Sequence, residues 1–433
     1  MGTRNERRNP VSRAMAPQAS NQVTLVRIAI LSQYFPPEPA IKLSVVVPYL
    51  AAAGHDVQVL TSLPNLPHGK IYPGYRYCAA MREKLLGADV LRTFVWPYRG
   101  RTVWKRALHL ISFSLSACIF GWQLRRFDLL YVYHPPLTIC APALLLAAVR
   151  GAPMLYDVQD LWPEAGLAAG AIERGVLYSL MVKCAGFTYA RARHITVIAP
   201  EFKTILADGG VPPAKISVIP NWTDEQCFRP VPSTGVRARY GLPEDSFVVM
   251  YAGNFGSSHG FGVILEAAQR LQTNRDIVFA VSGSGAEYER SVELCNAMAL
   301  TNVKFLGYVQ SRADLPYLYA GADVMIVHLR RSPSGAVSLP SRLMAYMACG
   351  RPILACCEGA PRNLVEKAAC GFGCEPENPA RMADLIVNAK MNRENLPNMG
   401  ASGRRYYLEN FSEAGTLRKL SGLLDSLVPA ATQ

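Results

Sequence analysis

The 433-residue sequence predicts an α/β protein made of two doubly wound domains, each a mainly parallel sheet covered by helices. Apolar runs of strand length alternate with segments of helix length along the chain, which is typical of consecutive βαβ units. The alternation stops once, in a polar and proline-punctuated stretch at 224–245, and then starts again. Half of the residues are apolar and 18% are charged. This composition supports large packed cores and excludes a disordered chain or a small disulfide scaffold.

The first half predicts a domain over residues 26–225, preceded by a disordered basic tail over 1–25 and followed by a linker over 226–245. A helix before Gly54 contains Pro48 and should be kinked there. Further helices are expected from Thr138 and over 176–191. The expected strands are 26–31, 57–60, 129–133, 153–158, 195–199 and 216–219.

The second half predicts a domain over 246–410 and a separate C-terminal helix over 411–433, whose leucines recur at helical spacing. A helix over 261–271 follows the first strand. Ligands of doubly wound sheets bind beyond the carboxyl ends of the strands, so we expect the active site in a cleft between the two domains. The expected strands are 247–252, 277–281, 303–306, 324–327 and 353–356.

Lys and Arg outnumber Asp and Glu by 45 to 32, which suits nucleic acid, an anionic lipid surface or a phosphorylated substrate. No nucleic-acid-binding module is recognisable, so we expect no nucleic-acid partner. Residues 76–106 carry eight basic side chains interleaved with Trp96, Tyr98 and Trp104, a pattern that fits an anionic membrane surface. The uncharged segment 107–124 is expected as a helix buried against the sheet, with an interfacial helix as the alternative. The eleven scattered cysteines fit reduced thiols, and we expect a cytoplasmic protein.

Two glycine-rich loops and one acidic loop follow predicted strands. The loop 253–260 joins a strand to a helix, so its glycines would let the backbone approach an anion at the helix N-terminus. The loop Gly283-Ser284-Gly285 has the same character. In the first domain, Asp160 and Glu164 follow the strand 153–158, where a carboxylate is better placed for a ligand than for packing.

Six sequence runs fall in an order that resembles the family 4 glycosyltransferases, which have the GT-B fold. The branch that is most similar is the bacterial one that builds colanic acid, O-antigen and other exopolysaccharides, including fucosaminyltransferase-like members. The runs are SQYFPPEP (32–39), GHDVQVLTSLPNLPHGKIYPGYR (54–76), YDVQDLWPE (156–164), VIPNW (218–222), YAGNFG (251–256) and LPSRLMAYMACGRP (339–352).

The resemblance implies two Rossmann-like domains and retaining transfer of a sugar from a nucleotide diphosphate sugar, without a metal or another cofactor. The second domain would bind the donor, and the first would bind a polyprenyl-linked or saccharide acceptor. Such an enzyme would be peripheral on the inner face of the cell membrane. Without a metal, backbone N–H groups and basic side chains must stabilise the leaving diphosphate. The donor-binding candidates are Gly253, Asn254, Gly256, His259, Gly283, Ser284, Arg330, Ser341 and Arg342.

The sequence departs from the family pattern at several of these positions. The family usually has Arg and Lys where this chain has Asn254 and His259, and His259 supplies a charge only when it is protonated. A pair of family glutamates is also missing: Ala345 occupies the second position, and Ala336 and Val337 occupy the region of the first. Arg342, one helical turn from Ala345, could hold the diphosphate instead.

Three residues are candidates for contacting the acceptor hydroxyl. Asp160 is the first candidate for accepting its proton or orienting it, Glu164 is the second and His134 is the third. Many family members have a histidine where Gln159 stands, so that base is absent here. Either carboxylate could instead cap the following helix, and a lone histidine is often structural.

Two alternatives to an active transferase remain open. The missing acidic pair is also expected in a catalytically weakened paralogue that acts as a partner in polysaccharide assembly. A GT-B-fold epimerase of nucleotide sugars would be detected as isomerisation without an acceptor.

Overall fold

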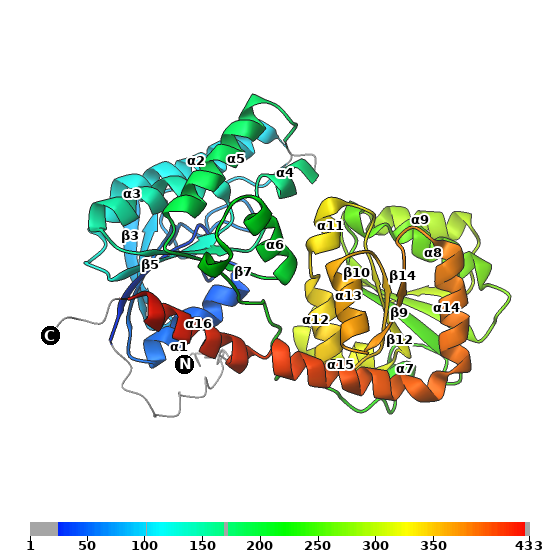
Figure 1. Ribbon diagram of the computed structural model, residues 1–433. Coiled ribbons are helices and arrows are strands. Elements are labelled where there is room, and N and C mark those ends of the chain that lie inside the picture. The colour runs from blue at the N-terminus through cyan, green and yellow to red at the C-terminus, as the bar shows by residue number, and fades with distance from the viewer. Residues whose placement is uncertain (1–24, 101, 169–171, 429–433) are drawn as a thin grey trace, which may run out of the picture.

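The computed structural model describes residues 25–100, 102–168 and 172–428, and the expected basic tail therefore lies outside the described residues. Two α/β domains lie side by side, each with a central sheet and helices on both faces (Figure 1). The predicted α/β class with two doubly wound domains is thereby confirmed.

The first domain contains an eight-stranded sheet in the order β3-β4-β2-β1-β5-β6-β7-β8, parallel except for the β3–β4 pair. Its strands are β1 (Arg27–Leu31), β2 (Asp56–Ser62), β3 (Ala80–Leu85), β4 (Ala88–Thr93), β5 (Leu129–His134), β6 (Met154–Val158), β7 (His194–Val197) and β8 (Ile216–Val218). Its helices are α1 (Ile41–Ala52), α2 (Val103–Phe120), α3 (Cys140–Arg150), α4 (Glu164–Ala168), α5 (Val176–Arg191) and α6 (Pro200–Asp208).

The second domain contains a fully parallel six-stranded sheet in the order β11-β10-β9-β12-β13-β14. Its strands are β9 (Phe247–Asn254), β10 (Ile277–Ser284), β11 (Val303–Phe305), β12 (Val324–His328), β13 (Ile353–Cys356) and β14 (Gly371–Cys374). The helices are α7 (Val236–Arg239), α8 (Phe261–Arg270), α9 (Tyr288–Ala297), α10 (Leu315–Ala320), α11 (Pro333–Val337), α12 (Ser341–Ala348), α13 (Ala360–Lys367), α14 (Pro379–Met391) and α15 (Leu396–Asn410). The C-terminal helix α16 (Glu413–Leu427) follows α15 and packs on the first domain.

Three strands are additional to those that the sequence predicted. β3 and β4 form an antiparallel hairpin whose two-residue turn, Leu86-Gly87, has positive φ at both positions. β14 is short and contains two glycines. A Cβ at Gly371 would lie 1.9 Å from the carbonyl oxygen of Ile353, so the close approach of this strand to β13 requires glycine.

The expected linker is partly folded. Within it, α7 packs on the second domain, where the Arg237 guanidinium pairs with the Asp323 carboxylate at 2.7 Å. The side chains of Val236 and Leu242 are buried at the same place. The prediction of a linker over the whole of 226–245 is therefore wrong for its second half.

Helix α2 was expected to be buried against the sheet, but only one of its faces is buried. One of its faces packs on the first domain, whereas the opposite face exposes large apolar side chains, including Leu115 and Ile119. Among the described residues, no helix is both long enough and apolar enough to cross a membrane.

The chain crosses between the domains twice, and the two crossings lie against each other. The Tyr407 hydroxyl, on α15, accepts a hydrogen bond from the Thr223 N–H at 3.1 Å and donates to the Thr223 carbonyl at 3.0 Å. The Trp222 indole N–H donates to the Glu413 carboxylate at 3.0 Å. Beyond this point α16 leaves the second domain and packs beside α1 of the first (Figure 1).

Candidate functional site

A cavity of about 700 Å³ lies between the two domains and is lined by both of them. It lies where α4 and α6 of the first domain face α11 and α12 of the second (Figure 1). The first domain contributes the loop that follows β6, and the second contributes the loops that follow β9 and β12. All three loops begin at carboxyl ends of parallel strands, which is where doubly wound sheets bind ligands.

Most of the donor-binding candidates from the sequence line this cavity. The structure brings together Gly253, Asn254, His259, Arg330, Ser341 and Arg342. Three further candidates, Gly256, Gly283 and Ser284, do not line it, although β10 pairs Gly283 with Gly253 and Ser284 with Asn254 in register. A Cβ on Gly283 would lie 1.8 Å from the Gly253 carbonyl oxygen, so Gly283 is required for packing between these two strand ends.

Arg342 is the best-defined cation of the donor side. It is the second residue of α12, and only 9% of its surface is exposed. Its guanidinium lies 4.8 Å from the ring centroid of Tyr251, a cation–π contact, and its Nη2 atom lies 2.8 Å from each ring nitrogen of His259. The Nη1 atom is buried and has no hydrogen-bond partner among the described residues. Because a buried guanidinium nitrogen is costly to leave unpaired, this atom is suited to an anionic ligand.

Gly253 leaves room for this arginine. A Cβ at Gly253 would lie 3.1 Å from the Nη1 atom of Arg342, and the glycine has φ of +156°. A side chain here would press on the unpaired nitrogen. The glycine thus keeps the backbone open beside the cation.

His259 is a neutral neighbour of the arginine and supplies no charge of its own. Burial and the nearby Arg342 charge lower the pKa of His259 to about 4. His328, which is buried, lies with Nδ1 2.6 Å from the His259 carbonyl oxygen and fixes that segment. The neutral ring can therefore accept a hydrogen bond from Arg342.

On the first-domain side, Asp160 and Glu164 line the same cavity. The Asp160 side chain is exposed to the cavity, but the surrounding protein partly desolvates its carboxyl group and raises its pKa. Glu164 is the first residue of α4, and the Tyr178 hydroxyl donates a hydrogen bond to its carboxylate at 3.3 Å. A carboxylate with a raised pKa is suited to accept a proton near neutral pH.

The structure does not bring His134 to the cavity. Its ring is completely buried at the end of β5 and stands tilted against Tyr156, with 5.5 Å between the ring centroids. Burial lowers the pKa of His134 to about 3. The third candidate for contacting the acceptor is thus wrong, because the side chain at this strand end points into the core.

A buried ion pair supports the acidic loop, and the sequence analysis did not identify it. The Lys42 ammonium lies 2.8 Å from the Asp157 carboxylate, which also accepts hydrogen bonds from Tyr131, Thr196 and Gln159. Gln159 occupies the position of the expected histidine. Its amide oxygen accepts a bond from the Asn221 side chain at 2.9 Å, next to the first domain crossing. Lys42 gave no signal in the sequence because it lies within an otherwise apolar helix.

The two missing glutamate positions have different surroundings. Val337 lines the cavity, so one wall is apolar where the family places an acid. Ala345 is buried in the core of the second domain and does not line the cavity. The charged side chain that α12 contributes to the cavity is Arg342, three residues before Ala345.

The cavity also contains residues that sequence reasoning missed. Arg174 and Tyr178 reach it from the start of α5, and the loop and short helix at 332–338 form much of the wall on the second domain. The Ser332 hydroxyl caps α11 by accepting a bond from the Gly335 N–H at 3.0 Å. Only the capping serine beside Pro333 could have indicated this helix from the sequence.

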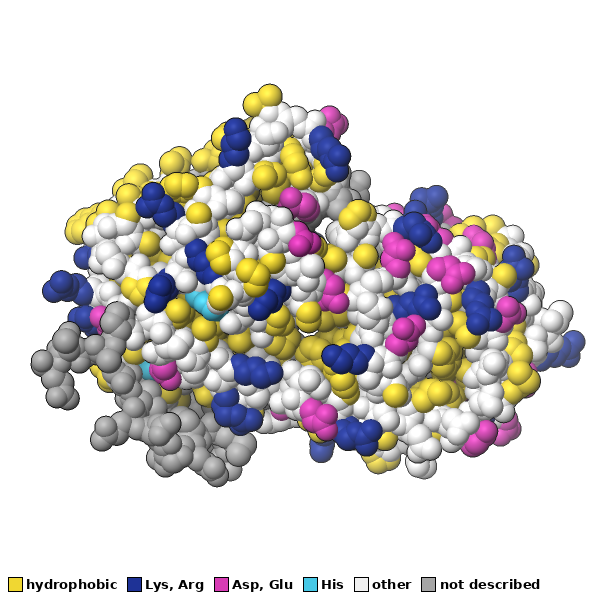
Figure 2. Space-filling view, in the orientation of Figure 1, with side chains coloured by type: hydrophobic (Ala, Val, Ile, Leu, Met, Phe, Trp, Pro, Cys, Tyr) yellow, Lys and Arg dark blue, Asp and Glu magenta, His cyan; other side chains and the backbone are white. Residues whose placement is uncertain are grey.

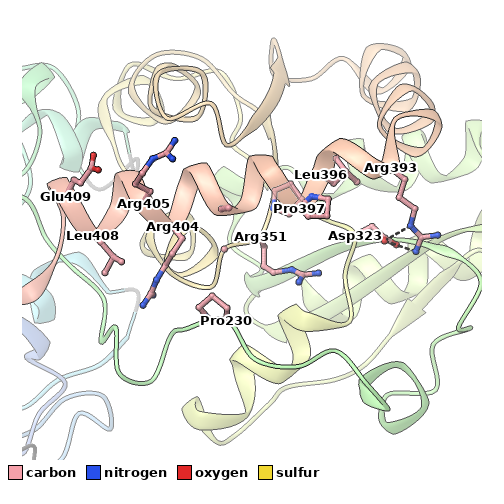
Figure 3. Close-up of a pocket in the computed structure, with 13 residues that line it drawn as sticks. Pro230, Asp323, Arg351, Arg393, Leu396, Pro397, Arg404, Arg405, Leu408 and Glu409 are labelled. Atoms are coloured by element: carbon pink, nitrogen blue, oxygen red, sulfur yellow. Dashed lines mark hydrogen bonds and ion pairs between the residues drawn. The ribbon is translucent and has the colours of Figure 1, made fainter.

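A different cavity, of about 750 Å³, lies between α15 and the loop that carries Pro230 (Figure 3). It is at the amino ends of β12 and β13, away from the interdomain cavity. Arg393 pairs with Asp323, Arg351 donates to the Ala322 carbonyl and Arg404 donates to the Ala348 carbonyl. These arginines have structural partners, so we do not place the active site there.

Among the described residues, no group of three or more His, Cys, Asp or Glu side chains is placed to hold a metal ion. Metal independence remains a prediction.

Comparisons with known proteins agree with this arrangement. Residues 44–222 match the glycosyl transferase 4-like domain, and residues 234–406 match the glycosyl transferases group 1 domain. The chain is 29% identical over 313 residues to WcaI of Escherichia coli (strain K12), named a colanic acid biosynthesis glycosyl transferase, covering 70% of this chain and 76% of WcaI. It is 26% identical over 257 residues to D-inositol 3-phosphate glycosyltransferase 1 of Catenulispora acidiphila, covering 56% of this chain and 59% of that protein.

Two solved structures show the same fold across nearly the whole chain. Anabaena HepE in complex with UDP-glucose superposes with a TM-score of 0.67 at 16% identity, covering 93% of this chain and 100% of HepE. WaaG, a glycosyltransferase involved in lipopolysaccharide biosynthesis, superposes with a TM-score of 0.62 at 15% identity, covering 92% and 99%. The two-domain fold implied by the resemblance is thereby confirmed.

Proposed function

The chain belongs to the GT-B-fold glycosyltransferases, with a glycosyl transferase 4-like first domain and a glycosyl transferases group 1 second domain. We propose that it transfers a sugar with retention of configuration. The donor is a nucleotide diphosphate sugar. The acceptor is a polyprenyl-linked or saccharide intermediate of surface polysaccharide assembly, and the enzyme is peripheral on the inner face of the membrane.

The observation that carries this proposal is one cavity with a cation on one wall and carboxylates on the other. Arg342 presents a buried guanidinium nitrogen that has no hydrogen-bond partner in the described part of the chain, and Asp160 presents a carboxyl group with a raised pKa. The leaving diphosphate would bind Arg342, with further support from Arg330 and the backbone N–H groups at the start of α12. Such fixed donors stabilise the negative charge that grows as the glycosidic bond breaks.

Asp160 would accept the proton of the acceptor hydroxyl or orient that hydroxyl, with Glu164 beside it. In a retaining transfer the hydroxyl attacks from the face that the diphosphate leaves, so no enzyme nucleophile is required. The names of WcaI and WaaG support a surface-polysaccharide acceptor, and HepE, which binds UDP-glucose, supports a nucleotide-sugar donor.

The test is a panel of UDP- and GDP-sugars incubated with polyprenyl diphosphate acceptors, followed by NMR of the product to read its anomeric configuration. We expect transfer with retention for one donor, unchanged by EDTA, and strongly reduced in Arg342→Ala and Asp160→Asn. Inversion would contradict the retaining mechanism, and loss of transfer in EDTA would contradict metal independence.

The weakened paralogue remains a second candidate because Val337 and Ala345 replace acidic residues of the family. A thermal-shift measurement with the same nucleotides separates the two, since a bound ligand raises the melting temperature. Nucleotide binding without transfer to any acceptor would favour the paralogue. Absence of both binding and transfer would count against either function.

A further inference from the structure

Helix α2 buries Phe113 and Ala117 in the core of the first domain, but it also turns polar side chains inward and apolar side chains outward. Its buried face includes His109, Ser114 and Ser116, which bond to protein groups: His109 Nδ1 lies 2.8 Å from the Trp96 carbonyl oxygen, and the Ser116 hydroxyl donates to the Phe94 carbonyl at 2.6 Å. Its outer face is a stripe of exposed apolar side chains at helical spacing, which is Trp104, Leu108, Ile111, Leu115, Ile119 and, just beyond the helix, Trp122. A water-facing surface has no need of such a stripe.

Two neighbouring helices extend this apolar surface. α3 packs against both α2 and α5, so the three helices form one side of the first domain (Figure 1). α3 exposes Leu145 and Val149, and α5 exposes Val176, Leu177, Leu180 and Phe187. Apolar side chains gather along this edge of the molecule in the space-filling view (Figure 2). We call the exposed apolar residues of α2, α3 and α5, together with Trp122, the three-helix face.

The charges on the three helices have a single sign, although Glu164 and Glu173 lie near the start of α5. None of the three helices contains an Asp or a Glu, whereas Lys105, Arg106, Arg150, Lys183 and Arg191 lie on them. Lys105 also lies 5.4 Å from the ring centroid of Trp104, and the Arg191 guanidinium lies 5.0 Å from that of Phe187. Apolar and aromatic side chains with cations on the same helices complement an anionic lipid surface.

The three-helix face is continuous with the entrance to the interdomain cavity. The first turn of α5 places Tyr178 on the cavity wall, while Leu177 and Leu180 in the same turn are exposed on the face. One helical turn therefore separates a surface suited to lipid from the cavity that contains Asp160 and Arg342.

We propose that the three-helix face docks on an anionic bilayer, with its apolar side chains in the interfacial region and α5 at the point where an acceptor passes from lipid to cavity. The second part of this inference rests on the proposed function, because it requires a lipid-linked acceptor. Among the basic residues of 76–106, Lys105 and Arg106 lie on α2 and belong to this surface, whereas Arg92 is fully buried and pairs with Glu83. The apolar contribution comes from α2, α3 and α5.

The test is flotation of the purified full chain with vesicles of phosphatidylcholine alone or mixed with phosphatidylglycerol, without donor or acceptor. We expect binding to the mixed vesicles, weaker binding at high salt, and a reduction of about tenfold or more in the double variants Leu115→Gln/Ile119→Gln and Leu177→Gln/Leu180→Gln. These four side chains are exposed, so the variants should fold normally. The matched control is Tyr308→Gln/Met391→Gln, which removes two equally exposed side chains from the second domain.

Wild-type protein that does not float with mixed vesicles, or double variants that float like the control, would overturn the proposal. Light scattering gives a further outcome against it. If the wild type does not bind lipid but forms a dimer, and Leu115→Gln/Ile119→Gln converts that dimer to a monomer, the three-helix face joins two copies of the chain instead of docking on a bilayer. Transfer to a short water-soluble acceptor is measured separately. Vesicle binding without transfer contradicts the proposed transfer activity and not this inference. Transfer without vesicle binding contradicts this inference and the proposed membrane location, but not the transfer activity.

Discussion

The Nη2 atom of Arg342 lies 2.8 Å from both ring nitrogens of His259, and the histidine is uncharged because its pKa is lowered to about 4. The arginine is thus oriented without being neutralised. The resemblance implies a lysine at position 259, whereas the arginine that lies here comes from a different element, the start of α12. The buried positive charge of the donor side is therefore the Arg342 guanidinium, which Tyr251 and His259 contact, while Arg330 adds an exposed charge to the same cavity.

Arg342→Ala should weaken donor binding strongly. A hydrogen bond to a charged group contributes about 1.5–3 kcal/mol, so the loss corresponds to roughly a 10- to 150-fold increase in the dissociation constant for the nucleotide. Arg342→Lys should recover only part of the affinity, because an ammonium cannot reproduce the planar contact with Tyr251. Isothermal titration with the preferred nucleotide measures both. Wild-type affinity in Arg342→Ala would place the diphosphate elsewhere.

Donor affinity should not depend on pH between about pH 6 and pH 8 through His259. Its lowered pKa keeps the ring neutral throughout that range, and protonation would begin only in more acidic solution, where it would place a second charge beside Arg342. The measurement is nucleotide affinity as a function of pH in the wild type and in His259→Gln. An affinity step near pH 6.5 that disappears in His259→Gln would contradict the buried, neutral assignment.

Asp160→Asn should lower kcat by about 10²- to 10⁴-fold, the usual contribution of a positioned general base, and leave nucleotide affinity nearly unchanged. The raised pKa gives the sign of the pH effect. Asp160 takes up its proton at a higher pH than an ordinary aspartate, so the rate should fall as the pH is lowered through that value. The asparagine variant should lose this acidic limb. Glu164→Gln is the control, and a larger effect there would reverse the two roles.

Ala345→Glu should not restore activity, although it recreates a family residue. Ala345 is 5% exposed and packs in the core of the second domain, so the new carboxyl group would lose hydration. We expect the free energy of unfolding to fall by about 1–3 kcal/mol in chemical denaturation. Ala345→Gln, of similar size and without charge, separates the contribution of charge from that of volume. A large gain in transfer rate would show instead that the donor ribose reaches this position.

Tyr407→Phe should loosen the connection between the domains. The hydroxyl that is lost bonds to both the N–H and the carbonyl group of Thr223, and each bond contributes about 0.5–1.5 kcal/mol. We expect a lower melting temperature and altered kcat, because domain closure depends on these crossings. Tyr317→Phe on the exposed surface is the control. Identical melting temperatures for the two variants would argue against a role of the hydroxyl group in stability.

Much of the fold could be predicted because most strands are short, predominantly apolar runs and both halves repeat the same alternation. The hairpin of β3 and β4 was missed because β3 is a partly exposed edge strand whose sequence, AMREKL, has three consecutive charged residues and therefore no alternation of apolar and polar positions. β14 was missed because Gly371 and Gly373 have low strand propensity, and only the close approach to β13 explains them.

Site residues could be predicted from the sequence where they lie in loops that follow strands, as Asp160 and Arg330 do. They could not be predicted where the direction of the side chain determines whether it reaches the cavity. His134 ends a strand as the sequence indicates, but its ring points into the core. Tyr178 begins a helix whose sequence gives no sign of the cavity beside it. For α2, hydropathy indicated a buried helix, whereas His109, Ser114 and Ser116 are buried and an apolar stripe that includes Leu115 and Ile119 is exposed.

The position of α16 has a practical consequence for protein engineering. Leu417, Leu420 and Leu424 complete the hydrophobic core beside α1, so the amino-terminal half expressed as an isolated fragment would leave those apolar contacts open to solvent. A chimaera that exchanges the donor-side lobe between relatives therefore needs two splice junctions, one near Trp222 and one near Glu413, where the polypeptide passes between the lobes. A single junction would combine one parent's amino-terminal sheet with the other parent's terminal helix.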